Sequence, residues 1–566
     1  MKTSHAGRGD ETAAKANVLI PLSLFALATL LLLPVFLYSF PNGDDVAQHY
    51  WWSKEFINEI GEGTIHPRWL SGAYEGRGSP VMLYYPPLPF YVVAFFYAFV
   101  GEPLRALSLA YWLGLALSGL TIYLFSRSLL SQRESLAAAL FYMAAHYHLF
   151  DFYQRAAQHE FWAFVWVPLL LYGIYRVSTE DISRALPYVS IGYFLLLVTH
   201  LPTTLMVTYL LPLYALLLSR DLRRLVRVAA GLALGAGMAA IHLFSYLFER
   251  GHLKSLGERT EIQRYYSGFL MENLGSAFAL VPLPSTGNFN LFVLAGDWMA
   301  VGFLILIAVC SWALWDSEYR RSTLVQSLWA VTVLSFLLST RISMPLWMIV
   351  PKFKQLQFPI RWFTITSLGI SLLFATAVSA VARCGKLSFK CYALAAAIIL
   401  NLTLSGLVIA RSPFQPEALQ KRILHYTDVR EYHPKWWDQK RHEEFDAAPV
   451  VVDRGNADIR VIDDTGASRS YVINAEQESV LRFRTLYFPG WTARAQGQPV
   501  MISPSKEGHI QMEIGPGEHI LMLSFEDTTP RTAGKTISAL SLVVFCVMLY
   551  IMRRKTGSLA ARDTNQ

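Results

Sequence analysis

Long apolar runs separated by short polar loops dominate the chain between residues 18 and 410. Many of these runs approach the roughly 20 residues that an α-helix needs to cross a bilayer. The first run, Val18–Tyr38, follows a basic tail at residues 1–17 and resembles a signal peptide in its charge order. It is too long for one and lacks a small-residue cleavage site, so we expect an uncleaved membrane helix. The pattern predicts a polytopic α-helical membrane protein.

Basic residues are concentrated in short loops between the apolar runs, as at Arg127–Arg133, Arg220–Arg227 and Arg383–Lys390. Such loops face the cytoplasm in most membrane proteins. The pattern therefore predicts that these loops and both tails, 1–17 and 553–566, are cytoplasmic. A net charge of +8 is explained in this way, and we expect no nucleic-acid partner.

Three apolar stretches follow the first polar loop: Leu88–Val100, Ala106–Phe125 and Leu136–Phe150. If all three crossed the membrane, Arg127–Arg133 would face outward. Leu88–Val100 is also short for a span. We therefore expect it to be a re-entrant or interfacial helix within a first outer loop of residues 39–105.

The remaining spans are expected near residues 161–176, 187–200, 203–219, 226–247, 291–315, 323–340, 361–382, 391–410 and 536–552. This arrangement gives about 12 crossings, with a transmembrane domain at 18–410 and a final helix at 536–552. All four cysteines lie in or beside spans, and the Asn-X-Thr sequon at Asn401 lies inside one. Both facts favour a bacterial inner (cytoplasmic) membrane, because they argue against a disulfide-stabilised, glycosylated outer domain.

The pattern changes to short alternating segments after Asp458, with turn residues between them. Alternation of this kind is typical of strands that bury one face. It predicts an extracytoplasmic antiparallel β-sandwich or jelly roll at about 455–530, inside an outer segment of 411–535. The aromatic and charged stretch before it, residues 412–450, would either cover a site or serve as a linker with an interfacial aromatic belt.

The first outer loop begins with Asp44 and Asp45, and His49 follows one helical turn later. A carboxylate supported by a histidine can act as a general base toward a hydroxyl, or hold Mg²⁺ or Mn²⁺ against a phosphate. Asp is also a favoured helix N-cap, so the pair could simply begin a helix. Both interpretations can hold, with Asp44 capping the helix and Asp45 catalytic.

The same loop carries Arg68 and Arg77 among closely spaced glycines. Arginine binds phosphate through a two-pronged contact, and glycine permits close approach of a ligand. We expect these arginines to bind the substrate phosphate. Alternatively, Arg68 and the adjacent Trp69 anchor the loop at the level of the lipid headgroups.

A second outer loop contains Asp151, Arg155 and Glu160 close to apolar sequence, where charges are costly and usually functional. Arg155 is expected to bind a lipid phosphate, while Asp151 or Glu160 supplies a second carboxylate for the acceptor or, with Asp45, for a metal. An ion pair between Arg155 and an acid that fixes the loop is the alternative. His200, at a later membrane boundary, is expected to be a hydrogen-bonded structural residue.

The late sequence KFKQLQFPIRW contains Lys354, Gln357 and Arg361, just before a span on the outer side. Cations there run against the usual charge bias, so we expect them to bind a donor phosphate or, alternatively, lipid headgroups. Sequence patterns for a Walker loop, a dinucleotide fingerprint, a zinc protease or a CxxC pair are absent. An ATP-driven transporter and a nicotinamide enzyme are therefore disfavoured.

Four stretches, taken in order, resemble one membrane protein family, the 6-pyruvoyl-tetrahydropterin synthase-related proteins, with their YfhO-like relatives. They read GDDVAQHYWW with GTIHPRWLSGAYEGRGSPVMLYYPPLPFYV, YQRAAQHEFWAFVWVPLLL, QLQFPIRWF, and YFPGW with GQPV and IGPGEHILMLSFEDT. The chain shows no soluble pterin-enzyme pattern. The resemblance implies the GT-C fold, which belongs to multi-span glycosyltransferases that use polyprenyl-phosphate sugars.

By this resemblance, Asp44 or Asp45 would be the base or a metal-linked carboxylate, and Asp151 or Glu160 the second acidic residue. Arg155 and Arg361 would hold the donor phosphate. The expected function is transfer of a sugar from a polyprenyl-phosphate donor to a glycan, lipid or protein acceptor of the cell envelope. The alternative is a non-catalytic transporter or assembly scaffold for lipid-linked glycans, in contact with the same membrane lipids.

Overall fold

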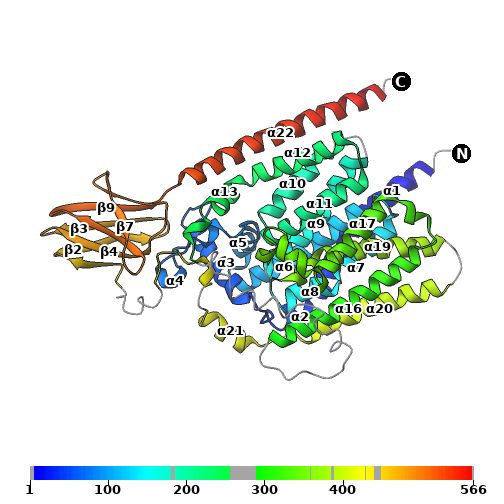
Figure 1. Cartoon of the computed structure of the whole chain (residues 1–566), viewed down its shortest axis with the longest axis horizontal. Helices are drawn as coiled ribbons and strands as arrows, with labels where there is room; N and C mark the ends of the chain where they lie inside the picture. The colour runs from blue at the N-terminus through cyan, green and yellow to red at the C-terminus, as the bar shows by residue number, and fades with distance from the viewer. Residues whose placement is uncertain are drawn as a thin grey trace.

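The structure, a computed structural model, describes residues 5–179, 185–254, 289–356, 358–383, 388–412, 414–426, 429–438 and 448–563. A large helical bundle occupies most of the molecule, and two β-sheets lie at one end of it (Figure 1). The start of α1 and the end of α22 lie at the opposite end from the sheets. The predicted combination of apolar helices and a C-terminal β-structure is confirmed.

The helices of the first half are α1 His5–Leu31, α2 Leu33–Leu37, α3 Val46–Gly61, α4 Ala73–Gly76, α5 Leu88–Val100, α6 Pro103–Ser126, α7 Gln132–Met143, α8 His146–Tyr153, α9 Gln158–Thr179, α10 Leu186–Leu197, α11 Leu201–Leu218, α12 Leu222–Met238 and α13 Ala240–Phe248. Those of the second half are α16 Phe289–Leu314, α17 Thr323–Leu338, α18 Met344–Ile349, α19 Phe363–Arg383, α20 Phe389–Ala410, α21 Pro416–Leu424 and α22 Thr529–Asp563. Short 3₁₀ helices include Pro359–Trp362, directly before α19. Most of the predicted apolar stretches therefore form helices with closely matching bounds. Three of them are wrong as single helices, because each is divided between two: 18–38 between α1 and α2, 136–150 between α7 and α8, and 226–247 between α12 and α13.

Seven helices in the described part of the chain are long and apolar enough to cross a membrane. An eighth span is added if α12 and α13, which meet at an 80° bend, form one broken crossing. Shorter apolar helices include α5, α10, α17 and the segment Val18–Leu31. Helix α5 has the predicted bounds, Leu88–Val100. That this helix does not cross the membrane stays a prediction.

Glycines allow neighbouring helices to approach closely in the bundle. A Cβ on Gly173 of α9 would lie 2.8 Å from the backbone nitrogen of Val189 in α10. A Cβ on Gly192 of α10 would lie 3.0 Å from the Cα of Leu170 in α9. Small residues at such crossings let backbones pack where no hydrophobic force favours association. This pair of glycines fixes α10 against α9, the helix that carries Glu160.

The C-terminal strands are β1 Val450–Arg454, β2 Ala457–Thr465, β3 Ser468–Ala475, β4 Ser479–Leu486, β5 Trp491–Ala495, β6 Gln498–Val500, β7 Ile502–Pro504, β8 His509–Ile514 and β9 Gly517–Phe525. They form two antiparallel sheets, with strand orders β1-β4-β8-β7 and β2-β3-β9-β5-β6. Alternate residues of facing strands, such as Ile473, Phe483, Met512 and Leu523, are buried in one shared core. The predicted two-sheet structure is thus present, and its first strand begins slightly earlier than expected.

The loop between α3 and α4 packs directly on the β-sheets. Trp69 is 1% exposed, and its ring lies 5.4 Å from that of Trp491 and 5.1 Å from that of Phe525. Beside it, Arg68 forms an ion pair with Asp527. Helix α22 then leaves the sheets and runs back along α12 and α13 (Figure 1).

A buried ion pair secures the start of α22. Arg531 donates through Nε to Oε2 of Glu249 at 2.9 Å, and both side chains are almost fully buried. Thr528 donates to the other carboxylate oxygen at 2.8 Å. The β-sheets are therefore held to the bundle by apolar packing and by paired charges.

Candidate functional site

Helix α8 and the turn after it place three polar side chains on one face. Tyr147, Asp151 and Arg155 are spaced by four residues along α8 and the turn that follows it, and this spacing brings helical neighbours together. Arg155 donates through Nη1 to Oδ1 of Asp151 at 2.6 Å. Ala156 then adopts a positive φ of 53°, which turns the chain into α9 and brings Glu160 to the same arginine.

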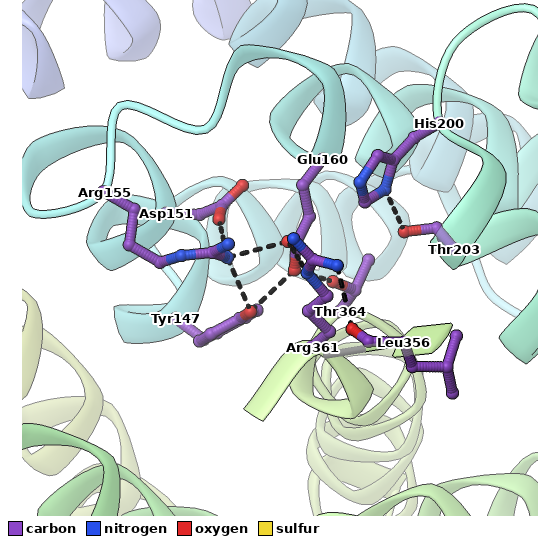
Figure 2. Close-up of polar contacts among 9 residues, drawn as sticks. All are labelled: Tyr147, Asp151, Arg155, Glu160, His200, Thr203, Leu356, Arg361 and Thr364. Atoms are coloured by element: carbon purple, nitrogen blue, oxygen red, sulfur yellow. Dashed lines mark hydrogen bonds and ion pairs between the residues drawn. The ribbon is translucent and has the colours of Figure 1, made fainter. Parts of the chain in front are cut away.

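Glu160 is the centre of a buried charge network, which we define as Tyr147, Asp151, Arg155, Glu160, Arg361 and Thr364 (Figure 2). Its Oε2 accepts from Nη1 of Arg155 at 2.7 Å and from Nε of Arg361 at 3.1 Å. Its Oε1 accepts from the Tyr147 hydroxyl at 2.7 Å and from the Thr364 hydroxyl at 3.4 Å. Two cations thus share one carboxylate that is 1% exposed.

Arg361 reaches this network from a distant part of the sequence. The 3₁₀ helix Pro359–Trp362 presents its side chain beneath Glu160, and Nη1 also donates to the Leu356 carbonyl oxygen at 2.8 Å (Figure 2). Its guanidinium lies over the ring of Phe358 at 5.1 Å. The predicted residues Asp151, Arg155, Glu160 and Arg361 therefore converge on one place.

The aspartate loop, Asn42–Asp45, is joined to the charge network through its backbone. The N–H of Asp44 donates to the Gln154 carbonyl oxygen at 3.1 Å, and that of Asp45 donates to Arg155 at 2.8 Å. Gly43 makes this approach possible, because a Cβ there would lie 2.9 Å from the Ala156 nitrogen. The aspartate loop and the turn between α8 and α9 are thus packed as one unit.

Asp45 occupies the N-cap position of α3, but its side chain makes no capping hydrogen bond. The expectation that Asp44 caps the helix is therefore wrong. The Asp45 carboxylate interacts electrostatically with Arg155, His49 and Asp151. It is partly exposed, so it lies between the charge network and solvent.

Burial controls the protonation of the residues around this pair. Loss of surrounding water and the charge of Asp45 both raise the pKa of Asp44 from its ordinary value. Burial lowers the pKa of His49 to about 4, so its imidazole is neutral at neutral pH. The His49 ring stacks on that of His159, with centroids 5.2 Å apart. A neutral imidazole that interacts with the Asp45 carboxylate can take part in proton transfer.

Several buried polar atoms beside the aspartate loop make no hydrogen bond within the described part of the chain. They are Oδ2 of Asp151, the hydroxyl of Tyr111 and Nδ1 of His49. Native proteins pair the great majority of such atoms with protein or water, so unpaired ones call for an explanation. Their position near two carboxylates and a guanidinium is suited to binding a polar ligand.

The other predicted cations lie elsewhere. Arg68 pairs with Asp527 on the β-sheet side, and Arg77 pairs with Glu75 at 2.8 Å. The Arg77 carbonyl oxygen accepts from the backbone N–H of Leu486, so this part of the loop supports the β-sheets. Gln357 lies outside the described residues, as does the side chain of Lys354.

The expected metal ligands do not form a recognisable metal site. Glu160 has both oxygens occupied by hydrogen-bond donors, two of them cationic. Among the described residues, no group of three or more His, Cys, Asp or Glu side chains could hold a metal ion. A metal held by Asp45 and Glu160 stays a prediction that this geometry does not favour.

Three residues that form or support the candidate site were not predicted from the sequence. Tyr147 was detectable, because it precedes Asp151 by four residues on the same helix face. Thr364 and Arg422 gave no local signal. Arg422 of α21 donates to the Gly43 carbonyl oxygen at 2.8 Å and also to that of Asp44, so a distant helix holds the aspartate loop. His200, in contrast, is hydrogen-bonded to Thr203 at 2.8 Å, as expected.

The sequence matches the model of one protein family and is similar to part of one curated protein. A family model described as 6-pyruvoyl-tetrahydropterin synthase related domain, membrane protein, matches residues 82–414. An uncharacterized protein of Lactococcus lactis subsp. cremoris (strain MG1363) is 27% identical over 218 residues, which are 38% of this chain and 35% of that protein. The chain thus spans about a third of the length of this curated relative.

Two solved structures show partial similarity of fold. The apo oligosaccharyltransferase of Archaeoglobus fulgidus matches with a TM-score of 0.47 and 15% identity, covering 73% of this chain and 61% of that one. The AglB oligosaccharyltransferase of the same archaeon, in complex with an inhibitory peptide and a dolichol-phosphate, matches with a TM-score of 0.43 and 14% identity over the same shares. In both cases this chain covers less than two thirds of the solved protein.

Proposed function

The chain belongs to the membrane protein family described as 6-pyruvoyl-tetrahydropterin synthase related, and on that premise we propose that it is a membrane glycosyltransferase. It transfers a sugar from a polyprenyl-phosphate donor to an acceptor of the cell envelope. The proposal rests on one observation: the two outer loops pack so that Asp44 and Asp45 lie beside the buried guanidinium of Arg155.

Arg155 is the residue we assign to the donor phosphate. All its side-chain hydrogen bonds to described residues come from Nη1, so Nε and Nη2 make none within that part of the chain. Arginine offers donors in a fork that matches phosphate geometry. Glu160 and Asp151 hold the guanidinium in place, while Arg361 adds a second positive charge to the same region.

The proposed reaction is a single displacement. The acceptor hydroxyl oxygen forms a bond to the anomeric carbon, and the bond between that carbon and the donor phosphate oxygen breaks. The electron pair leaves with the phosphate, whose charge Arg155 and Arg361 stabilise. The hydroxyl proton passes to Asp45 or Asp44, and the raised pKa of Asp44 favours its acceptance of a proton.

The proposal includes a topology. The chain crosses a bacterial inner membrane about 12 times, with the basic loops in the cytoplasm. The aspartate loop, the charge network and the β-sheets then lie outside the cytoplasm. The placement of the sheets at the end opposite α1 and the end of α22 supports this orientation (Figure 1).

Sugar transfer in proteoliposomes tests the function. Purified full-length protein would receive a panel of radiolabelled polyprenyl-phosphate sugars together with cell-envelope acceptors. Replacing the base by Asp45→Asn or Asp44→Asn is expected to lower the rate on the order of 10²–10³-fold. Asp316→Asn is the matched control, because that carboxylate is exposed and paired with Lys390 at 3.2 Å. Full activity of both aspartate-loop variants would refute the mechanism.

The second candidate is a transporter or assembly scaffold for lipid-linked glycans. The observation in its favour is the 80° break between α12 and α13, because broken helices are common in transporters. Its activity would follow a proton or sodium gradient, whereas sugar transfer would not. Donor binding without transfer, unchanged by Asp44→Asn and Asp45→Asn, would favour this alternative.

A further inference from the structure

A cavity of about 740 Å³ lies beside the aspartate loop, outside the charge network. Helices α2, α6 and α21 form its walls, and most of its lining is apolar. Residues at the walls include Val35, Ser108, Leu419 and Ile423. Its volume falls within the range of about 300–1,000 Å³ that is typical of small-molecule sites. A chamber of this composition is suited to a hydrocarbon chain.

The mouth of the cavity combines exposed apolar side chains with one cation. Phe36 and Leu424 line it and are 44% and 69% exposed. The exposed Arg105 makes no side-chain hydrogen bond or ion pair to any residue that the structure describes. The nearby Glu102 makes no ion pair with it in the described part of the chain, and its carboxylate instead accepts from the backbone N–H groups of Leu104 and Arg105 at 2.9 and 2.7 Å. An anionic headgroup would complement this cation.

The cavity lies on the side of the aspartate loop opposite Arg155. In a trans peptide the N–H and C=O point in opposite directions. The N–H groups of Asp44 and Asp45 donate to Gln154 and Arg155, whereas the carbonyl oxygens of Gly43 and Asp44 accept from Arg422. Arg422 belongs to α21, which forms a cavity wall through Leu419 and Ile423. The aspartates therefore separate the charge network from the cavity.

We propose that this cavity holds the hydrocarbon chain of an anionic membrane lipid, and that this lipid is the sugar acceptor. The inference rests on the proposed function, which places the donor phosphate at Arg155. Phe40 lines the cavity and precedes Asp44 by four residues, so the two Cα atoms are at most about 14 Å apart. A lipid headgroup held by Arg105 can thus present its hydroxyl to the aspartates from the side opposite the donor.

Photocrosslinking of the full-length protein in nanodiscs tests the binding. The probes would be phosphatidic acid and diacylglycerol, each with a diazirine in the acyl chain. The anionic probe is expected to label peptides of α2 and α21, and Arg105→Gln is expected to lower that labelling about tenfold, since a charged hydrogen bond is lost. Arg133→Gln, at an exposed position on α7, is the matched control. Equal labelling by both probes, unchanged in Arg105→Gln, would show bulk lipid only and overturn the proposal.

Transfer kinetics distinguish failure of this inference from failure of the proposed function. If the acceptor is an anionic lipid, Arg105→Gln raises the KM for the lipid acceptor about tenfold and leaves the KM for the polyprenyl-phosphate sugar unchanged. Transfer to a glycan or peptide acceptor, with no effect of Arg105→Gln, would overturn the acceptor role while the glycosyltransferase stands. Selective labelling in a protein that transfers no sugar would refute the proposed function, and the acceptor role with it.

Discussion

The backbone N–H of Asp45 donates a hydrogen bond of 2.8 Å to the carbonyl oxygen of Arg155. This bond joins the loop that carries the acidic pair to the turn that carries the guanidinium of the charge network. The side chains of the two residues are thereby held in one region by backbone contacts that do not depend on their charges. The relationship predicts that a change in loop packing alters activity even when every charged side chain is retained.

Gly43→Ala tests this relationship without removing a functional group. The new Cβ would lie 2.9 Å from the Ala156 nitrogen and 3.0 Å from the Arg155 carbonyl carbon. Both are backbone atoms, so the loop itself has to shift to relieve the clash. A misplacement of about 1 Å at a catalytic site can lower the rate about 10²-fold, and we expect a loss of this order in the transfer assay. Gly61→Ala is the control, since a Cβ there meets no atom within 4 Å. Equal activity of the two variants would show that loop packing does not limit transfer.

Glu160→Gln is expected to destabilise the bundle strongly. The substitution leaves two cations, Arg155 and Arg361, without the carboxylate that they share. Removing one partner from a buried ion pair costs about 3–5 kcal/mol. Thermal unfolding in detergent should show a much lower midpoint than for Glu318→Gln, which breaks an exposed pair with Arg383. Similar midpoints for the two variants would mean that Glu160 is not needed to balance these charges.

Trp69→Ala should weaken the attachment of the β-sheets. Trp69 is 1% exposed and packs on Trp491 and Phe525, so truncation leaves a cavity in a shared core. Such a change costs about 3–5 kcal/mol. Limited proteolysis should cut the variant faster between bundle and sheets, and Trp315→Ala, at a position 61% exposed, should match the unchanged protein. An unaltered cleavage rate for Trp69→Ala would argue against this interface.

The lowered pKa of His49 predicts that the folded protein loses stability in mild acid. Its pKa is about 4 in the folded protein and 6.5 ordinarily, so folding favours the neutral imidazole. The resulting stabilisation is present above pH 6.5 and is lost as the pH falls from 6.5 toward 4. The difference corresponds to about 3 kcal/mol. Burial raises the pKa of Glu59, which acts in the opposite sense and favours the folded state as the pH falls.

Thermal unfolding midpoints measured between pH 7 and pH 4 check this prediction. This pH range follows from the two pKa values of His49. His49→Gln should show a smaller fall than the unchanged protein, because no imidazole is left to take up a proton. His425→Gln, at an exposed position, should keep the full fall. The comparison cancels the contribution of Glu59, which all three proteins share. A fall of the same size in His49→Gln would remove His49 as its cause.

Much of the candidate site was predictable as a set of residues but not as an arrangement. Asp151, Arg155 and Glu160 were recognisable because charges beside apolar sequence are costly and therefore conspicuous. Arg68 was expected to bind phosphate because it lies among closely spaced glycines, but its partner is Asp527 on the β-sheet side. Residue type indicates that a charge needs a partner, whereas only the fold determines which partner it finds.

The sequence by itself determined most of the helices and strands, because their signals are local. The stretch Leu88–Val100 became α5 with the same bounds, and the alternation after Asp458 became paired strands. Only the tertiary structure decided that Arg361 meets Glu160 across 201 residues, and that Arg422 holds the aspartate loop from α21. Apolar periodicity depends on each residue's own neighbours along the chain. Ion pairs and backbone contacts between distant loops depend on how all the helices pack, and no local pattern encodes that.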